Sequence, residues 1–521
     1  MNLRLPFNKA TTLWPDREAL VEGNERFTYK QFGERVAALA AALLKQRLPK
    51  GARIAVVAPN GLRYMECYYA ITLAGYVILP VNFRLSADEM SSIFHDADIS
   101  LLIGHADFTD PIEKALARTP FLNKIIWLPP FAQNLIVPGE NYEDLISENI
   151  GQPLPDLELQ GDDLAQLYYT SGTTGRPKGV MLTQENVTFH ALATAYELGL
   201  SDEDVWLHVA PMFHLADAWA LFSLTWAGGQ HVFLPYFDSE KVLAVMESEN
   251  ITLAAMVPTM VNSLLHHKDI AKYSFKNLRL MMTAGSPIAP ELVRKIVDIF
   301  GCDYRQFYGM TETSPFLTIS TPKAHLRNLP EDQLLALKSR TGRSFLGVEL
   351  RVVREDGSEV EANDKEIGEI VARGPSVTKG YWRQPEATAQ TIRDGWLHTG
   401  DLAVIDKEGY VNVVDRKKDM IITGGENVYS TEVEYVLHEH PAVLECAVFG
   451  QPDPDWGETV VATVVLKPNQ NTDAQTLIDF VKSKIAGYKA PKTIHFLPEL
   501  PKTGSGKIFK RGLKDQFIAK L

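Results

Sequence analysis

The sequence predicts an α/β protein with a large N-terminal domain of parallel α/β sheets, a small antiparallel β subdomain and a small α+β C-terminal domain. First, 521 residues exceed the size at which a single core stops growing, so two or more domains are expected. Second, short apolar runs alternate with helical patterns over the first 300 residues, as in buried parallel sheets. Third, short alternating strands with Asp-Gly turns follow.

Helix and strand signals alternate through the N-terminal part. One helical face is marked by apolar residues spaced four, three and four apart, namely Phe32, Val36, Leu39 and Leu43. Buried strands are predicted at RIAVV (53–57), YVILPV (76–81), SLLIG (100–104), KIIWLP (124–129), HVFLP (231–235), TLAAMVP (252–258) and LRLMMTAG (278–285). A further helix is predicted over 290–300, with Pro290 in its first turn and Gly301 at its C-cap.

The pattern changes near Gly342. The segments GVELRVVREDGSEV, GEIVARG and GYVNVVDR alternate polar and apolar residues, which predicts an antiparallel subdomain. DRKKD (415–419) offers little to bury and predicts a junction, dividing the chain into domains 1–414 and 415–521. In the second domain a helix is predicted over 431–440, with Thr431 and Glu434 as a capping box.

Composition excludes some classes of protein. The net charge of −13 argues against bulk nucleic-acid binding, although local basic sites for anionic ligands remain open. The three cysteines, Cys67, Cys302 and Cys446, show no disulfide framework or zinc spacing, which favours a cytoplasmic protein. We see no signal peptide and no run near the roughly 20 apolar residues of a transmembrane helix; peripheral membrane contact stays open.

A glycine-rich segment, YTSGTTGRPKGV (169–180), predicts a phosphate-binding loop. It is not the usual P-loop, because Pro177 precedes Lys178 and Gly179 follows it where Ser or Thr should stand. Backbone N–H groups and hydroxyls could converge on a polyphosphate here. The candidate ligands are Thr170, Ser171, Gly172, Thr173, Thr174, Gly175 and Lys178. The composition of this segment alone fits a surface turn rich in small residues as well as it fits a phosphate-binding loop.

Other segments carry candidate ligands. YGMTETSP (308–315) places Glu312 between two threonines, suited to Mg²⁺, although a solvated acidic residue is the simpler interpretation of that segment alone. Asp401 follows a glycine turn and could accept from ribose hydroxyls, and Arg416 could bind phosphate or ribose. PKTGSGKIFKR (501–511) sets Lys507 in a glycine-flanked loop that could reach into another domain's cleft.

Five of these segments occur together in one order: SGTTGRPKG, YGMTE, HTGDL, DRKKDMI and PKTGSGKI. In this the chain resembles the acyl-adenylate-forming (AMP-binding) superfamily of acyl-CoA synthetases, luciferases and peptide-synthetase adenylation domains, over essentially its whole length. The resemblance implies a two-step reaction. A carboxylate attacks the α-phosphate of Mg·ATP and releases pyrophosphate; a thiol then attacks the acyl-adenylate and displaces AMP.

The resemblance also implies roles for individual residues. Lys507 would bridge the carboxylate and the α-phosphate, Thr311 would contact that phosphate, and Glu312 would bind Mg²⁺. Tyr308 would stack on adenine. The rest of the predicted ATP site beyond the glycine loop comprises Gly285, Ser286, Pro287, Gly309, Asp401 and Arg416.

In the family the C-terminal domain is mobile and turns between the two steps. Asp415 matches the hinge position. The turn would withdraw Lys507 and bring Gly424 and Gly425 to line the tunnel for coenzyme A. Family members are often dimers, so a homodimer stays open.

The acid is the least defined part of the prediction. His214 matches a family position beside the substrate carboxylate, where we expect a gating or packing role, and Trp219, Val257 and Gly285 complete an apolar acyl pocket. No Asp/Lys pair is evident that could bind an α-amino acid, although Asp217 is a candidate to contact its ammonium group. The sequence favours a medium- or long-chain fatty acid over a benzoate- or cinnamate-type aryl acid, with coenzyme A as the thiol. Alternatives are a luciferase-like oxygenase, a non-catalytic acyl or nucleotide sensor, and a P-loop NTPase releasing ADP.

Overall fold

Apolar runs in the first third of the chain form a mostly parallel sheet. The computed structural model describes residues 1–131, 139–170, 177–503 and 508–518. Within these residues one sheet has the order β7-β6-β5-β3-β4-β8-β9, and only its last pair is antiparallel. Its strands are β3 (Arg53–Val57), β4 (Val77–Val81), β5 (Ile99–His105), β6 (Ile125–Leu128), β7 (Glu140–Asn141), β8 (Leu164–Thr170) and β9 (Lys178–Thr183).

A longer sheet joins the predicted parallel core and the predicted antiparallel subdomain. Its main path is β17-β18-β20-β21-β16-β15-β14-β13-β12-β10-β11-β1-β2, so the two parts share one hydrogen-bonded ladder. Strands β10 to β14 pair in parallel, and β15 to β21 pair antiparallel. The strands are β1 (Glu18–Glu22), β2 (Glu25–Thr28), β10 (Val205–His208), β11 (Gln230–Phe233), β12 (Leu253–Met256), β13 (Leu280–Ala284), β14 (Asp303–Gly309), β15 (Phe316–Ile319), β16 (Gly342–Ser344), β17 (Glu349–Val353), β18 (Gly368–Arg373), β19 (Ile392–Arg393), β20 (Trp396–Ile405) and β21 (Tyr410–Arg416).

Helices pack against both sheets, and two of them show how local sequence sets their ends. Helix α2 begins after Thr28, which forms a capping box with Gln31, and buries the predicted apolar face. Helix α11 has Pro290 in its first turn and ends at Gly301, whose φ of +65° suits glycine. The helices of this part are α1 (Arg4–Leu13), α2 (Tyr29–Lys45), α3 (Leu62–Leu73), α4 (Ala87–Ala97), α5 (Thr109–Ala117), α6 (Tyr142–Asn149), α7 (Gln184–Leu198), α8 (Ala218–Ala227), α9 (Ser239–Ser248), α10 (Pro258–Leu265), α11 (Pro290–Phe300), α12 (Glu331–Ser339) and α13 (Pro385–Thr391).

The last hundred residues form a separate small α+β unit with its own apolar core. Its elements are β22 (Ile421–Thr423), β23 (Glu426–Val428), α14 (Ser430–Glu439), β24 (Val443–Asp453), β25 (Gly457–Leu466), α15 (Ala474–Lys484), β26 (Thr493–Phe496) and α16 (Lys510–Ile518). The predicted capping box on α14 is wrong. The Thr431 hydroxyl donates to the Val414 carbonyl, and Glu434 accepts from the Val448 N–H, so tertiary partners replace the local cap.

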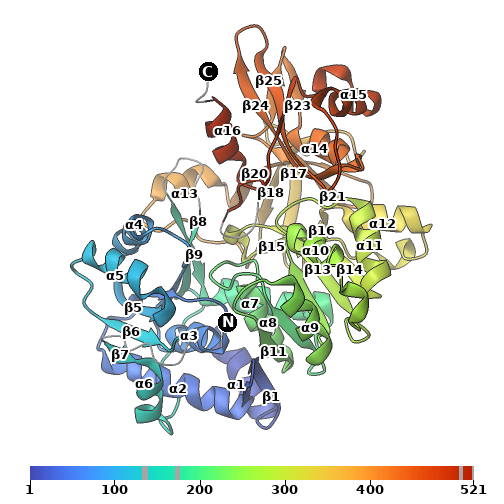
Figure 1. Cartoon of the computed structure of the whole chain (residues 1–521). Helices are drawn as coiled ribbons and strands as arrows, with labels where there is room; N and C mark the ends of the chain where they lie inside the picture. Colours follow the sequence, from blue (N-terminus) through green and yellow to red (C-terminus); the bar gives the residue numbers. More distant parts are fainter. Residues whose placement is uncertain (132–138, 171–176, 504–507, 519–521) are drawn as a thin grey trace.

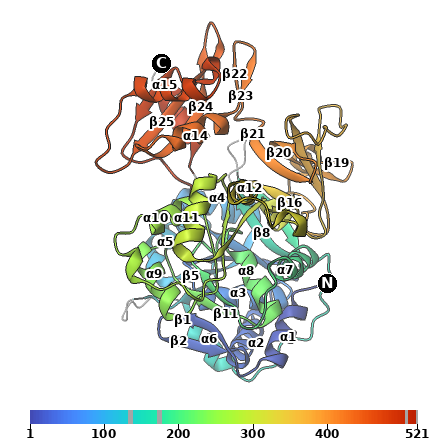
Figure 2. The ribbon, with the colours of Figure 1, turned by 90° about the vertical axis from the view of Figure 1, so that its right-hand side faces the viewer.

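The two parts of the molecule meet near the end of the long sheet. Figure 1 shows the C-terminal unit, in orange and red, standing on the side of the N-terminal domain where β20 and β21 lie. Figure 2 shows the same arrangement from the side, with β21 leading from one part to the other. The predicted fold class is confirmed. Across the described ranges, no helix is long and apolar enough to cross a membrane.

Candidate active site

A β-hairpin carries the predicted phosphate loop. Strands β8 and β9 are antiparallel, and Thr170 pairs with Lys178 at the end of their ladder. Both side chains are half-buried. The Lys178 ammonium lies over the ring of Tyr381, 4.8 Å from its centroid. The predicted ligands Ser171, Gly172, Thr173, Thr174 and Gly175 lie outside the described residues.

The predicted metal ligand lies beside this hairpin. Strand β14 ends at Gly309, where a Cβ would fall 1.8 Å from the Pro315 carbonyl oxygen, so only glycine fits. The chain then forms a 3-10 helix, Thr311–Thr313, in which Thr311 is buried and Glu312 half-buried. The Tyr381 hydroxyl donates to Glu312 Oε1 at 2.9 Å. Burial raises the pKa of the Glu312 carboxyl, and the charge of Lys178 opposes that shift.

This arrangement fits a magnesium ion bound together with a nucleotide. In the parts of the chain that the structure describes, no group of three or more His, Cys, Asp or Glu could hold a metal ion. Mg²⁺ is commonly held by one or two carboxylates plus substrate phosphates. Glu312 could supply that carboxylate, with phosphate oxygens and water completing the shell. We therefore expect metal binding to depend on the nucleotide.

A second polar group lies where β14 meets the antiparallel strands. The Tyr308 hydroxyl donates to Asp401 Oδ2 at 2.6 Å, and Arg416 Nε lies 3.4 Å from Asp401 Oδ1. Burial, followed by the nearby Asp401 charge, raises the pKa of Tyr308. Asp401 and Arg416 face each other because they pair in register between β20 and β21. Their predicted nucleotide roles remain predictions.

The third predicted nucleotide segment follows β13. Gly285 has a φ of +91°, in the region that favours glycine, and the residues 285–287 are exposed. The Gln306 side-chain amide donates to the Ser286 carbonyl at 2.9 Å, which fixes this turn beside β14. The turn and Tyr308 therefore lie at the same ends of neighbouring parallel strands, the usual location of ligands in open α/β sheets.

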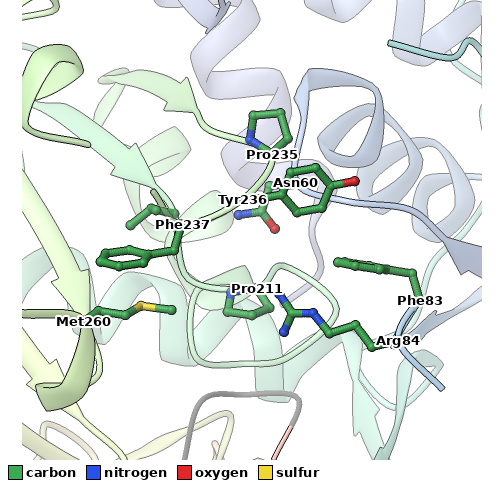
Figure 3. A pocket seen from close by; sticks show the side chains of 9 residues that line it. Asn60, Phe83, Arg84, Pro211, Pro235, Tyr236, Phe237 and Met260 are labelled. Carbon is green, nitrogen blue, oxygen red and sulfur yellow. The ribbon is translucent and has the colours of Figure 1, made fainter. Parts of the chain in front are cut away.

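His214 lies on the loop between β10 and α8. It is half-buried, and its Nδ1 accepts from the Ala216 N–H at 2.9 Å, so the neutral ring carries its proton on Nε2. Asn60 secures the same loop by donating to the Ala210 carbonyl and accepting from the Met212 N–H. A small pocket opens beside the loop (Figure 3), lined by Asn60, Phe83, Arg84, Val209, Pro211, Pro235, Tyr236, Phe237 and Met260.

The other predicted acyl residues are buried. Trp219 is 2% exposed, and its indole N–H donates to the Ala216 carbonyl at 3.2 Å. Its ring meets Trp206 at 5.0 Å and Phe316 at 4.8 Å, both in edge contacts. Val257 is 6% exposed and precedes α10. Trp219 is thus held between two aromatic neighbours, in a packed rather than a freely rotating position.

Asp217 belongs to a fully buried polar network. Its carboxylate contacts His208 Nδ1 at 2.7 Å and accepts from the Trp206 indole N–H at 3.3 Å. His208 Nε2 lies 2.9 Å from His231 Nδ1. Burial lowers the pKa of His231, which keeps that ring neutral. Since both carboxylate oxygens have protein partners, Asp217 is not placed to bind a substrate ammonium.

The predicted hinge residue is also buried. Asp415 accepts from the Ser430 hydroxyl at 3.2 Å and from the Arg416 N–H at 2.7 Å. Lys510 lies beside it, with its ammonium 2.7 Å from both Ser430 Oγ and Glu434 Oε1. The start of α16 is therefore tied to α14 and to the end of β21. Lys507 itself lies outside the described residues.

The predicted coenzyme A residues lie apart from these groups. Gly424 and Gly425, with φ of +60° and +84°, form the turn of the β22–β23 hairpin. Figure 2 shows this hairpin near the outer edge of the C-terminal unit. The present arrangement of the two parts does not bring it to the N-terminal groups.

Models of known families match most of the chain. The AMP-binding enzyme family matches residues 7–382, and the AMP-binding enzyme C-terminal domain matches residues 432–507. This chain belongs to the AMP-binding enzyme family. The membership predicted from the five ordered segments is confirmed.

Individual members of the AMP-binding enzyme family resemble the chain from end to end. A feruloyl-CoA synthase of Amycolatopsis sp. is 37% identical, over 98% of this chain and 99% of its own. A 2-succinylbenzoate–CoA ligase of Bacillus cytotoxicus is 34% identical, over 96% of each chain. The crystal structure of the anthranilate CoA ligase AuaEII with anthranoyl-AMP superposes with a TM-score of 0.91 at 26% identity, over 100% of this chain and 98% of its own. The prediction of an AMP-forming acid–CoA ligase agrees with these names.

Some residues of this AMP-binding enzyme were not found from the sequence. Tyr381 contacts both Lys178 and Glu312, yet it belongs to none of the five segments. The GYW triplet at 380–382 was the available signal, but aromatic residues after a glycine are common in turns and cores. Lys510 and His208 were also missed, because their partners lie on other elements.

Proposed function

We propose that this protein is an AMP-forming acid–CoA ligase that activates an aryl acid. In the first step a carboxylate oxygen of the acid bonds to the α-phosphorus of ATP, and pyrophosphate leaves. In the second step the thiolate of coenzyme A bonds to the acyl carbon, and AMP leaves with the electron pair of the broken C–O bond. Atoms balance as acid, ATP and coenzyme A giving acyl-CoA, AMP and pyrophosphate.

The observation that supports this reaction is the convergence of Lys178 and Glu312 on one aromatic side chain, Tyr381. Two anions must meet in the first step, so cationic groups and N–H donors have to offset their repulsion. In the proposal Lys178 and Thr170 hold the leaving phosphates, and Thr311 contacts the α-phosphate. Mg²⁺ at Glu312 would reduce the phosphate charge when bound.

The remaining nucleotide contacts follow from the Tyr308–Asp401–Arg416 group. In the proposal the Asp401 carboxylate, which accepts from the Tyr308 hydroxyl and lies beside Arg416, would also accept from the ribose hydroxyls. The face of Tyr308 and the turn at 285–287 would enclose adenine. Lys507 would meet the reacting oxygens as a mobile point charge on a long side chain.

The aryl substrate is proposed from the acyl end of the site. Trp219 is enclosed by Trp206 and Phe316, so a long alkyl chain passing that position would have to displace a packed ring. Asp217 is engaged by His208 and Trp206, which disfavours an amino acid. The three relatives described above are named for ring-bearing acids. On these grounds we favour an aryl acid over the fatty acid that the sequence favoured.

The reaction is tested by product analysis over a panel of acids. Benzoate, anthranilate, ferulate, 2-succinylbenzoate, decanoate, dodecanoate and several amino acids are each incubated with Mg·ATP, with and without coenzyme A. We expect AMP, pyrophosphate and an aryl-CoA thioester, with the thioester formed only when coenzyme A is present. Formation of ADP would point to the NTPase alternative, oxygen uptake to an oxygenase, and no turnover with any acid to a sensor. Turnover confined to fatty or amino acids would overturn the aryl assignment.

A further inference from the structure

The segment 378–383 lies beside β9, to which one isolated bridge and two backbone hydrogen bonds join it. The Trp382 N–H donates to the Gly179 carbonyl at 2.7 Å, and the Met181 N–H donates to the Gly380 carbonyl at 3.1 Å. Val180 and Tyr381 form an isolated antiparallel bridge between these two bonds. The Tyr381 hydroxyl donates to Glu312, whereas the Trp382 indole N–H donates to the Asp96 carbonyl. Tyr381 and Trp382 therefore contact different parts of the domain.

Trp382 fastens the segment to the first sheet. Its indole N–H donates to the Asp96 carbonyl at the end of α4, at 3.1 Å. The guanidinium groups of Arg53 and Arg383 lie over its ring, 5.1 and 5.3 Å from the centroid. Since Arg53 lies on β3 and Asp96 on α4, these contacts tie the backbone next to Tyr381 to the first sheet and its helix.

Tyr381 reaches the candidate site from the other side. Its hydroxyl donates to Glu312 Oε1 at 2.9 Å, and the face of its ring lies 4.8 Å from the Lys178 ammonium. The side chain is buried at 7% exposure, and its own N–H donates to Thr388 Oγ1 at 3.0 Å. The Thr378 N–H also donates to the Glu312 carbonyl at 2.7 Å. One short segment thus contacts the carboxylate, the loop that carries it and the ammonium.

We propose that Tyr381 is a positioning residue for the metal and phosphate end of the site. Its hydroxyl holds one oxygen of Glu312, which turns the second oxygen toward a metal ion, and its ring fixes the Lys178 ammonium near the leaving phosphates. This rests on the proposed function, because it takes Glu312 as the metal ligand and Lys178 as a phosphate ligand. Partners that orient a metal-bound carboxylate commonly alter metal affinity by about 10- to 100-fold when removed.

The two contacts of Tyr381 can be separated by two substitutions. Tyr381→Phe removes the hydroxyl and keeps the ring, whereas Tyr381→Leu removes both. Binding of Mn²⁺ is measured by electron paramagnetic resonance with the enzyme and α,β-methylene-ATP, after subtracting Mn²⁺ bound by the free analogue. Binding of the analogue itself is measured by calorimetry in EDTA. Neither readout needs turnover.

We expect Tyr381→Phe to weaken Mn²⁺ binding about tenfold and to leave metal-free binding of the analogue unchanged. Tyr381→Leu should weaken both. In steady-state pyrophosphate release, Tyr381→Phe should raise the Mg²⁺ concentration for half-maximal rate and leave the KM for the acid unchanged. Trp382→Phe, which removes the indole hydrogen bond to Asp96 and keeps the Tyr381 hydroxyl, is the matched control and should weaken Mn²⁺ binding clearly less than Tyr381→Phe does.

Glu312→Gln separates failure of this proposal from failure of the proposed function. If Glu312→Gln retains wild-type Mn²⁺ affinity, the metal role of Glu312 fails, and with it the basis for Tyr381. If Glu312→Gln loses Mn²⁺ binding but Tyr381→Phe keeps it, the positioning role alone is wrong. Equal weakening by Tyr381→Phe and Trp382→Phe would also overturn it, because the effect would then come from the segment and not from the hydroxyl.

Discussion

The proposed nucleotide end and the proposed acyl end of this candidate site are built differently. At the nucleotide end, half-buried polar side chains such as Lys178, Glu312 and Tyr308 lie on strand ends and short turns. At the acyl end, Trp219 and its aromatic neighbours are packed as in a core. The reaction common to the family needs charges that can meet ATP, whereas the choice of acid depends on how a buried surface is filled.

The largest effect is expected from Lys507, which the proposed function assigns to both reacting anions. Lys507→Ala should lower adenylate formation about 10³-fold, because it removes the cation proposed to bridge the two reacting anions. Thioester formation from a supplied acyl-adenylate should remain near the wild-type rate. Pyrophosphate release measures the first step, and acyl-CoA formation measures the second. Unchanged adenylation would contradict the role given to Lys507.

Removing Asp217 tests how much the buried Asp217–His208–Trp206 network stabilises the proposed acyl end. Asp217→Ala leaves His208 and the Trp206 indole without their acceptor in the core. We expect a loss of about 3 kcal/mol in the unfolding free energy of the N-terminal domain. Urea unfolding followed by tryptophan fluorescence measures this. As a control, Lys114→Ala, at an exposed ion pair on α5, should change stability by less than about 1 kcal/mol. A loss as small as that of the control would show that the network is dispensable.

A substitution at the proposed hinge should leave the residues assigned to ATP and to the acid in place and should affect only the second step of the reaction. Asp415→Pro restricts the backbone where the C-terminal domain is proposed to turn. Thioester formation should fall roughly 100-fold while adenylate formation stays within about twofold of wild type, since misplaced reacting groups can cost that much. Both half-reactions are measured in single turnover. Equal loss of both would argue against a hinge at this position.

The smallest expected effect is on selectivity. Trp219→Leu shortens the side chain that fills the acyl end and should raise kcat/KM for dodecanoate relative to ferulate about tenfold. The KM for ATP should not change, because the ring partners of Trp219 among the described residues are His190, Trp206, Phe307 and Phe316, none of which is assigned to ATP. If the KM for ATP rises as much as the KM for the acid, then Trp219 affects nucleotide binding as well as the choice of acid, which contradicts the proposed division of the site.

More residues could be assigned from sequence to the proposed nucleotide end, because its residue types follow from the charge of ATP and stand in short segments; these roles remain predictions. Asp401 and Arg416, each assigned from its own segment, prove to be neighbours. Tyr381 could not be assigned, since its place depends on a segment that joins β9 from about 200 residues away along the chain. The error at Glu434 has the same origin: a local cap was expected, but Lys510 and the Val448 N–H, both distant in sequence, bind this carboxylate.

The most direct test of the account compares two acids on the wild-type enzyme. The quantity measured is the ratio of kcat/KM for ferulate to kcat/KM for dodecanoate. Both values come from coenzyme A-dependent release of AMP at saturating Mg·ATP. A packed acyl end predicts a ratio of about 100 in favour of the ring acid. A ratio at or below one would contradict it, because a long alkyl chain would then pass the position that Trp219 fills.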